Sequence, residues 1–296
     1  MPRPPVTEEA TVCRLFGLTA GSTRVRATFW LLDAPDSLAE QSHANPDGTG
    51  LGTFDADDRP VVEKQPLAAF DDAAFASEAR ERVSTTFVAH VRHSSGAAVA
   101  PENTHPFEQD GRLFAHNGVV AGMDVLDRHL DEDRRLVHGQ TDSERLFALV
   151  TRETARAGGD VGAGITAALR WVADELPVYA ANLVLTTATD LWAVRYPDTH
   201  ALWVLERHRP RGRLHHRSRA GTRVVSDELS DTPSVVVASE RLDEDPWRML
   251  EPGVLLHVDE HLRVTEEVVV DHEPRHRLTL EDLGEAAASQ RPTGRA

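Results

Sequence analysis

The sequence predicts an α+β protein built of stacked layers. Two stretches rich in β-branched residues flank a middle stretch whose apolar residues recur with helical periodicity. A sheet or a helix has to bury its apolar face against another element. Two β-rich halves with helices between them therefore favour sheets that pack in layers with helices.

The expected elements follow the chain in order. In the first half, strands are expected at residues 11–18, 52–54, 60–63, 85–92 and 112–118. Residues 55–58 are turn formers that join two of these strands into a hairpin, and glycines make residues 41–52 a loop. Helices are expected at residues 71–82, 124–130, 143–156 and 165–176, with a further helix starting in the apolar patch at 29–32. Asp142 stands in the capping position of the helix at 143–156.

The second half is dominated by strands, expected at residues 181–187, 191–196, 201–205, 234–239, 254–258 and 264–270. Residues 207–223 are dense in Arg and His, which is typical of a solvated loop or hairpin; a basic patch for an anionic ligand is the alternative. We expect one domain over residues 13–270. Residues 1–12 are a leader or follow a misassigned start, and residues 271–296 are a flexible tail.

Composition narrows the class of protein. The chain has 48 acidic residues against 32 Lys and Arg, a net charge of −16, which disfavours nucleic acid and anionic membranes as partners. No apolar run approaches the roughly 20 residues of a membrane-spanning helix. One cysteine argues against a disulfide-stapled secreted fold, and residues 1–5 lack the apolar core of a signal peptide. We therefore expect a cytoplasmic location.

Cys13 is that one cysteine, so it serves either packing or thiol chemistry. Three polar segments follow it in order: Arg92-His93-Ser94-Ser95-Gly96, then Glu102-Asn103-Thr104-His105-Pro106-Phe107 leading to His116-Asn117-Gly118, and finally Gly139-Gln140-Thr141-Asp142-Ser143-Glu144. Each segment alone has an ordinary interpretation as a surface charge, a turn or a helix cap. A cysteine nucleophile could use polar segments of these kinds.

Cys13-Arg14-Leu15-Phe16-Gly17 and the three segments together resemble the glutaminase domain of class II, or N-terminal-nucleophile, glutamine amidotransferases. The resemblance runs from Cys13 to about Leu149 and continues more weakly to Val258. The start and the Asn-Thr-His-Pro-Phe segment look most like the stand-alone members, including the γ-glutamyl amide hydrolases of ergothioneine synthesis. The resemblance implies a four-layer αββα sandwich with two antiparallel sheets between helical layers.

The resemblance also implies roles for individual residues. Cys13 would be the nucleophile, and the Asn117 side chain with the Gly118 backbone N–H would bind the oxyanion. Arg92 and Asp142 would clamp the carboxylate and ammonium of glutamine, roles that suit a bidentate guanidinium and a carboxylate. Ser95 stands where many members carry a Thr that touches the same carboxylate, and Gly96 where synthase-fused members carry a His. His105 and His116 are expected to be structural, hydrogen-bonded histidines.

In such enzymes the base is the α-amino group of the nucleophile, and Cys13 as written is internal. Residues 1–12 are then either a propeptide or the result of a misassigned start. A GTG codon is read as Val within a gene and as Met at an initiation site, so if Val12 is the true start, removal of that Met would leave Cys13 first; we favour the second. The expected reaction is hydrolysis of glutamine or a related γ-glutamyl amide through a thioester, with no cofactor and no metal. An ammonia-accepting synthase would be a separate chain, and a homo-oligomer stays open. The alternative is a non-catalytic binding protein that has lost the free N-terminal cysteine.

Overall fold

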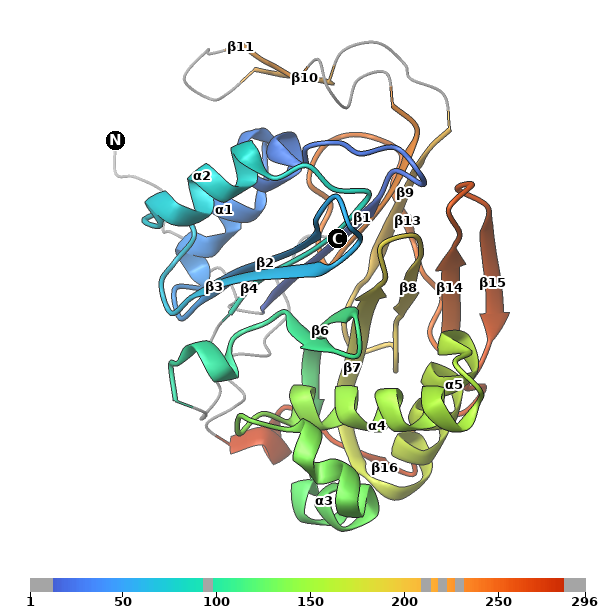
Figure 1. The fold of residues 1–296 in the computed structure, drawn as a ribbon. Coiled ribbons are helices and arrows are strands. Elements are labelled where there is room, and N and C mark those ends of the chain that lie inside the picture. Colours follow the sequence, from blue (N-terminus) through green and yellow to red (C-terminus); the bar gives the residue numbers. More distant parts are fainter. Residues whose placement is uncertain (1–12, 93–97, 209–213, 218–222, 227–231, 285–296) are drawn as a thin grey trace.

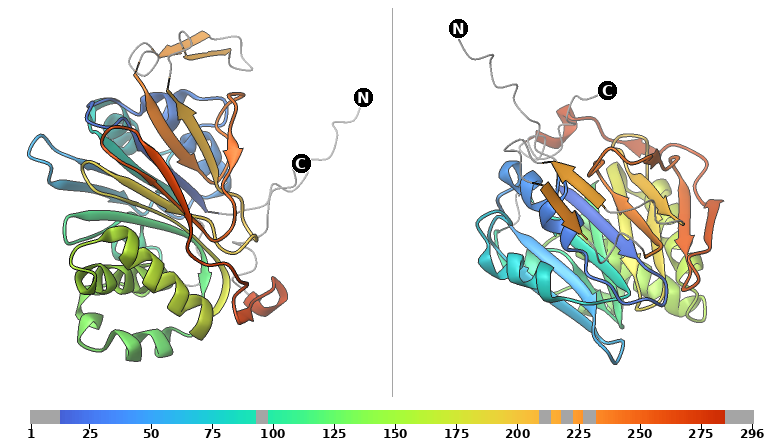
Figure 2. Two further views of the ribbon diagram at one scale, coloured as in Figure 1. Left: turned by 90° about the vertical axis from the view of Figure 1, so that its right-hand side faces the viewer. Right: turned by 90° about the horizontal axis from the view of Figure 1, so that it is seen from above.

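The computed structural model of the protein describes residues 13–92, 98–208, 214–217, 223–226 and 232–284. In this part of the chain two sheets lie face to face, with helices on the outer side of each (Figure 1). The views in Figure 2 show the same stacking from the side and from above. The predicted α+β sandwich is confirmed.

The first sheet has seven strands joined by antiparallel pairing throughout. Its order across the sheet is β13 (Arg248–Met249), β9 (Trp203–Arg207), β12 (Ser234–Ala238), β1 (Arg14–Thr19), β4 (Thr86–Val91), β2 (Thr49–Phe54) and β3 (Pro60–Gln65). Strand β1 is central, and all six of its residues are buried. Its neighbour β4 pairs Val91 with Arg14, so the residues just outside the two strands, Cys13 and Arg92, stand opposite each other.

The second sheet is antiparallel except at one short strand. Its order is β15 (Val264–Val268), β14 (Val254–Val258), β8 (Leu191–Val194), β7 (Pro177–Thr186), β6 (Arg112–Val120) and β5 (Phe107–Gln109). The short strand β16 (His276–Arg277) pairs in parallel with β7. It lies in the segment that the sequence assigned to a tail, and the domain limits of that assignment stay a prediction.

Helices cover the outer faces of the sheets. On the first sheet lie α1 (Leu38–Gln41), α2 (Ala73–Glu81) and the π-helical turn Phe29–Asp33, and on the second lie α3 (Met123–Leu130), α4 (Asp142–Arg156) and α5 (Val161–Glu175). Short 3-10 turns occupy Ser42–Ala44, Pro101–Asn103 and Asp131–Leu136. Asp72 and Asp160 cap α2 and α5 by accepting backbone N–H groups of the first turn.

The apolar core is divided as this layering requires. Phe16 and Leu18 of β1 pack with the helices on the first sheet, whereas Leu15 points between the sheets and packs with residues of β6 and β7 such as Ala115 and Val184. Successive strand residues point to opposite faces, so one strand serves two core layers. A further cluster joins the second sheet to α4 and α5. The four layers αββα are therefore those that the resemblance implied.

Two local predictions need correction. Thr141, not Asp142, is the N-cap of α4, because the Thr141 side chain accepts the backbone N–H of Glu144 while Asp142 is already helical. The apolar patch at Phe29 forms a π-helical turn of five residues and not the start of a longer α-helix. The Arg- and His-rich stretch contains a two-stranded hairpin, β10 (Leu214–Arg217) with β11 (Arg223–Ser226).

Candidate active site

Cys13 lies directly before β1 and is half-buried. Its backbone carbonyl accepts a hydrogen bond of 2.8 Å from the side-chain amide of Asn117 on β6. Burial lowers the pKa of Arg92 from its usual value, and electrostatic interactions with Cys13 and Asp47 oppose that shift. The thiol is thus an electrostatic neighbour of the guanidinium. The strand register agrees, because Arg14 pairs with Val91 and the next residues, Cys13 and Arg92, stand opposite each other.

Asn117 and Gly118 come to this place on β6. Asn117 is 1% exposed, and its amide nitrogen carries two hydrogens, of which one goes to the Cys13 carbonyl. Gly118 has a φ of 152°, and a Cβ there would lie 2.0 Å from the carbonyl oxygen of Ala180 on β7. Only glycine fits this position, so the sequence Asn-Gly has a structural reason here that is not a turn.

Asp142 is the first residue of α4, and its carboxylate is held from two sides. One oxygen accepts the backbone N–H of Val120 at 2.8 Å, and the other accepts that of Ser143 at 2.9 Å. The Ser143 hydroxyl also lies 2.9 Å from Nδ1 of His116, which is buried on β6. These bonds fix the carboxylate next to the end of β6, two residues beyond Gly118.

Asn103 links the Asp142 loop to Arg92. Its side-chain oxygen accepts the backbone N–H of Gln140 at 2.8 Å, and its side-chain nitrogen donates to the carbonyl of Ala98 at 3.1 Å. That carbonyl also accepts a 3.3 Å hydrogen bond from Nη1 of Arg92. A circuit of interactions therefore runs from Cys13 through Asn117 and β6 to Asp142, and from the loop before Asp142 through Asn103 to Arg92. The electrostatic interaction of Arg92 with Cys13 closes it.

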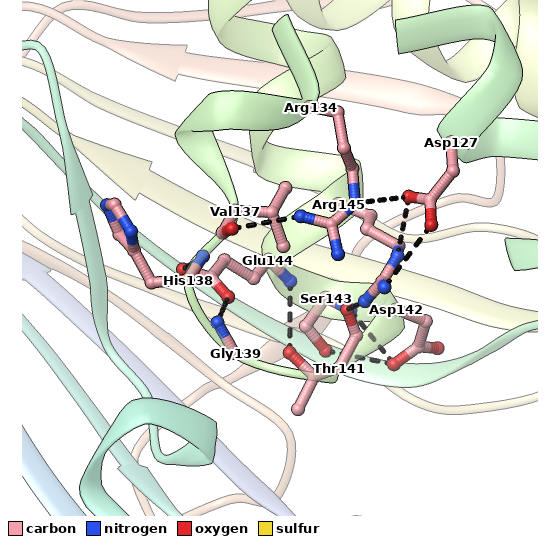
Figure 3. Close-up of polar contacts among 10 residues, drawn as sticks. All are labelled: Asp127, Arg134, Val137, His138, Gly139, Thr141, Asp142, Ser143, Glu144 and Arg145. Atoms are coloured by element: carbon pink, nitrogen blue, oxygen red, sulfur yellow. Dashed lines mark hydrogen bonds and ion pairs between the residues drawn. The ribbon is translucent and has the colours of Figure 1, made fainter. Parts of the chain in front are cut away.

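The loop before α4 is held by a buried carboxylate (Figure 3). Glu144 is 4% exposed and accepts the backbone N–H groups of His138 at 3.0 Å and Gly139 at 2.6 Å. Arg145 bonds the Thr141 carbonyl at 3.0 Å and the Asp127 carboxylate at 2.8 Å. Each anchor lies within the first turn of α4, so the helix start and the loop are one rigid unit.

Two further histidines lie under the site between the sheets. The rings of His90 on β4 and His105 are 4.2 Å apart, and no nitrogen of either ring has a hydrogen-bond partner among the described protein atoms. Burial, and then the charge of Arg92, lowers the pKa of His90 to about 3. Burial likewise places the pKa of His105 well below its usual value. Both rings are therefore neutral, and the expectation of a hydrogen-bonded His105 is wrong.

Five of the predicted site residues lie on this circuit or next to it: Cys13, Arg92, Asn117, Gly118 and Asp142. Ser95 lies outside the described residues, as do Gly96 and His93. Sequence reasoning assigned no role to Asn103 or Glu144. The spacing Thr141-x-x-Glu144 is the signature of a capping box, but here Glu144 bonds the preceding loop and not the cap itself.

No group of three or more His, Cys, Asp or Glu residues in the described ranges is arranged to hold a metal ion.

Among the helices of the described part of the chain, none is long and apolar enough to cross a membrane.

Comparison with known proteins places this architecture in a family. A model of the class II glutamine amidotransferases matches residues 12–279. A γ-glutamyl-hercynylcysteine sulfoxide hydrolase of Mycolicibacterium smegmatis is 30% identical over 251 residues, which cover 79% of this chain and 92% of the relative. A Saccharomyces cerevisiae protein named as a probable glutamine amidotransferase is 30% identical over 170 residues, covering 50% of this chain and 47% of its own length.

The chain spans less than two thirds of some relatives, among them an uncharacterised Methanocaldococcus jannaschii protein that is 27% identical over 234 residues, 75% of this chain and 63% of the relative. Among solved structures, a glutamine aminotransferase class-II domain protein of Silicibacter pomeroyi superposes with a TM-score of 0.57 at 21% identity, covering 86% of this chain and 99% of the other. That likeness supports the fold. With a family model that spans most of its length, the chain belongs to the class II glutamine amidotransferases.

Proposed function

We propose that this protein hydrolyses glutamine or a related γ-glutamyl amide through a γ-glutamyl thioester on Cys13. The observation that carries the proposal is this circuit of interactions, which gathers a thiol, an amide donor, a guanidinium and a carboxylate from four separate parts of the chain. A γ-glutamyl head group presents one carboxylate, one ammonium and one amide carbonyl. The guanidinium matches the substrate carboxylate and the protein carboxylate matches the ammonium, while the thiol and the amide donor both act on the amide carbonyl.

The base in this proposal is the α-amino group of Cys13, whose ordinary pKa of about 7.7–8.0 suits proton transfer near neutral pH. The amine takes the thiol proton while sulfur bonds to the amide carbon. The Asn117 amide and the Gly118 N–H stabilise the oxyanion that forms. The C–N bond then breaks, the ammonium returns its proton to the leaving nitrogen, and ammonia or an amine departs.

The second half of the reaction reverses these roles. The amine takes a proton from water as hydroxide attacks the thioester. The C–S bond then breaks, the ammonium returns its proton to the sulfur to restore the thiol, and the released γ-carboxylic acid loses its proton to solvent. Arg92 and Asp142 hold the amino-acid head through both halves. Because an amide nitrogen is not a base, the proposed mechanism requires that Cys13 carry a free α-amino group.

The leaving amine is the least defined part of the substrate. The similarity to a γ-glutamyl-hercynylcysteine sulfoxide hydrolase over most of that protein favours a γ-glutamyl amide larger than glutamine. If the leaving group is ammonia, a separate synthase chain would be its acceptor.

The test compares the full chain with a chain that starts at Cys13, with release of glutamate and of ammonia or amine as the readout. The short chain is expected to turn over, and its Cys13→Ala variant is the control that should not. A diazoketone analogue of glutamine should add one covalent label, on Cys13. The short chain could instead bind glutamine, as a rise in Tm would report, without hydrolysing it or taking the label. That result would make this a binding protein.

A further inference from the structure

Asn103 lies between the segment at Ala98, which bonds Arg92, and the loop at Gln140, which precedes Asp142. Arg92 and Asp142 are the two proposed clamp groups. It is 1% exposed and ends the 3-10 turn Pro101–Asn103. The turn is closed by its own bonds, from Asn103 N to the Ala100 carbonyl at 3.0 Å and from the Thr104 hydroxyl to the same carbonyl at 2.9 Å. The side chain therefore projects from a rigid support, not from a mobile loop.

One end of the Asn103 amide fixes the Arg92 side. Its nitrogen donates to the Ala98 carbonyl at 3.1 Å, and Nη1 of Arg92 donates to that carbonyl at 3.3 Å. The guanidinium and the Asn103 side chain are thus held by the same carbonyl oxygen. A shift of the Ala98 carbonyl would move the guanidinium with it.

The other end fixes the Asp142 side. The Asn103 oxygen accepts the N–H of Gln140 at 2.8 Å, two residues before Asp142. The loop is seated closely here, since a Cβ on Gly139 would lie 2.7 Å from that oxygen and 2.5 Å from the Glu102 carbonyl. Glu144 holds the same loop from the helix side. A small change at Asn103 is thus transmitted to the start of α4.

We propose that Asn103 is a positioning residue that sets the spacing between the Arg92 guanidinium and the Asp142 carboxylate, and so matches the clamp to an α-amino acid head group. The proposal rests on the proposed function of these two groups. A side-chain amide suits this task because it offers a donor and an acceptor at once. A carboxylate offers acceptors only, and an alkyl side chain offers neither.

The variants Asn103→Asp and Asn103→Ala separate the two ends of the amide. Asp keeps the acceptor for the Gln140 N–H and loses the donor to Ala98, so it should disturb the Arg92 side alone. Ala should disturb both sides. The substrates are glutamine, glutaramate, which lacks the α-amino group, and 4-aminobutanamide, which lacks the carboxylate.

In a chain that begins at Cys13, Asn103→Asp should raise KM for glutamine and glutaramate about 10- to 100-fold, the scale of a misplaced binding group, with kcat little changed. It should leave 4-aminobutanamide unaffected. Asn103→Ala should also reduce the preference for glutamine over glutaramate. Each preference is a ratio of kcat/KM values measured on one protein sample, so a smaller folded fraction does not change it.

Gln109→Ala is the matched control. Gln109 is another buried amide, 6% exposed, that donates to the Leu136 carbonyl at 3.2 Å and contacts neither clamp group. It should lower stability and leave all ratios unchanged. Binding of the same three compounds to Cys13→Ala protein, measured by calorimetry, reports the clamp without turnover. If the Cys13→Ala protein binds the compounds with the expected ratios but the chain with Cys13 intact has no activity, the hydrolase proposal is refuted. If Asn103→Asp and Asn103→Ala leave the ratios as in the parent, the positioning role is refuted.

Discussion

The neutral histidines between the sheets make the stability of this protein depend on pH, and His90 gives a measurable share. His90 is 1% exposed, and its nitrogens have no partners among the described atoms. Burial, with Arg92 and then His116 as further causes, lowers the pKa of His90 from 6.5 to about 3. The unfolded chain therefore binds a proton at this residue below about pH 6.5 while the folded chain does not.

The sign follows from that difference in bound protons. The stabilising contribution is fully present above the unfolded pKa of 6.5 and is lost as pH falls from there toward the folded pKa of about 3. Between about pH 7 and about pH 5, one such histidine lowers the unfolding free energy by about 2 kcal/mol. Burial lowers the pKa of His105 and of His116 too, so their effects have the same sign.

The assay is urea unfolding of the parent and of His90→Phe at several values of pH. Phe keeps a ring beside His105 and cannot titrate, so the parent should lose about 2 kcal/mol more than the variant over this range. Phe107→Leu, a change to a ring that lies 4.7 Å from His105, should lower stability equally at every pH. Equal pH dependence in the parent and His90→Phe would show that His90 is protonated, or hydrated, in the folded protein and would refute the reasoning.

Three further outcomes are expected in a chain that begins at Cys13. Arg92→Lys should lower kcat/KM for glutamine about 10- to 150-fold in steady-state kinetics, because the bidentate fork is lost; a change below twofold would contradict the clamp. Asn117→Ala should lower kcat about 10²- to 10³-fold with KM nearly constant, and an effect on KM alone would indicate ground-state binding instead. Thr141→Ala should reduce the unfolding free energy by about 1 kcal/mol, measured by urea titration, whereas an unchanged value would mean that the cap is dispensable.

Much of the fold could be read from local patterns. The helices at Asp142–Arg156 and Val161–Glu175 and the strand at Val254–Val258 begin and end within a few residues of their predicted limits. Apolar periodicity and the turn residues between elements are patterns within short stretches of sequence, so they can be recognised without the structure. The cap of α4 was misassigned because Thr141 and Asp142 are both good capping residues, and only the path of the backbone separates them.

The residue types of the site could be predicted from the sequence, but the hydrogen bonds that connect them could not. The bond from Asn117 to Cys13 spans 104 residues, and the bond from Gln140 to Asn103 spans 37. Such pairings depend on strand register and loop path, which a sequence pattern does not encode. Asn103 bonds a backbone N–H 37 residues away, and Glu144 bonds the loop before its own helix where the sequence suggests a capping box, so neither role follows from the local pattern.

The pairing of β6 with β7 contains an irregularity between the proposed oxyanion donors and the residue that holds Asp142. The register shifts between Val119 and Val120, and the Val120 N–H bonds the Asp142 carboxylate. A β-bulge of this kind redirects backbone groups and is common beside active sites. Gly118 precedes Val120 by two residues, or about 7 Å along the strand, so β6 carries a proposed oxyanion donor and also the N–H that holds the proposed ammonium-binding carboxylate. That length is on the scale of an extended glutamine side chain, as the proposed binding of a γ-glutamyl group beside β6 requires.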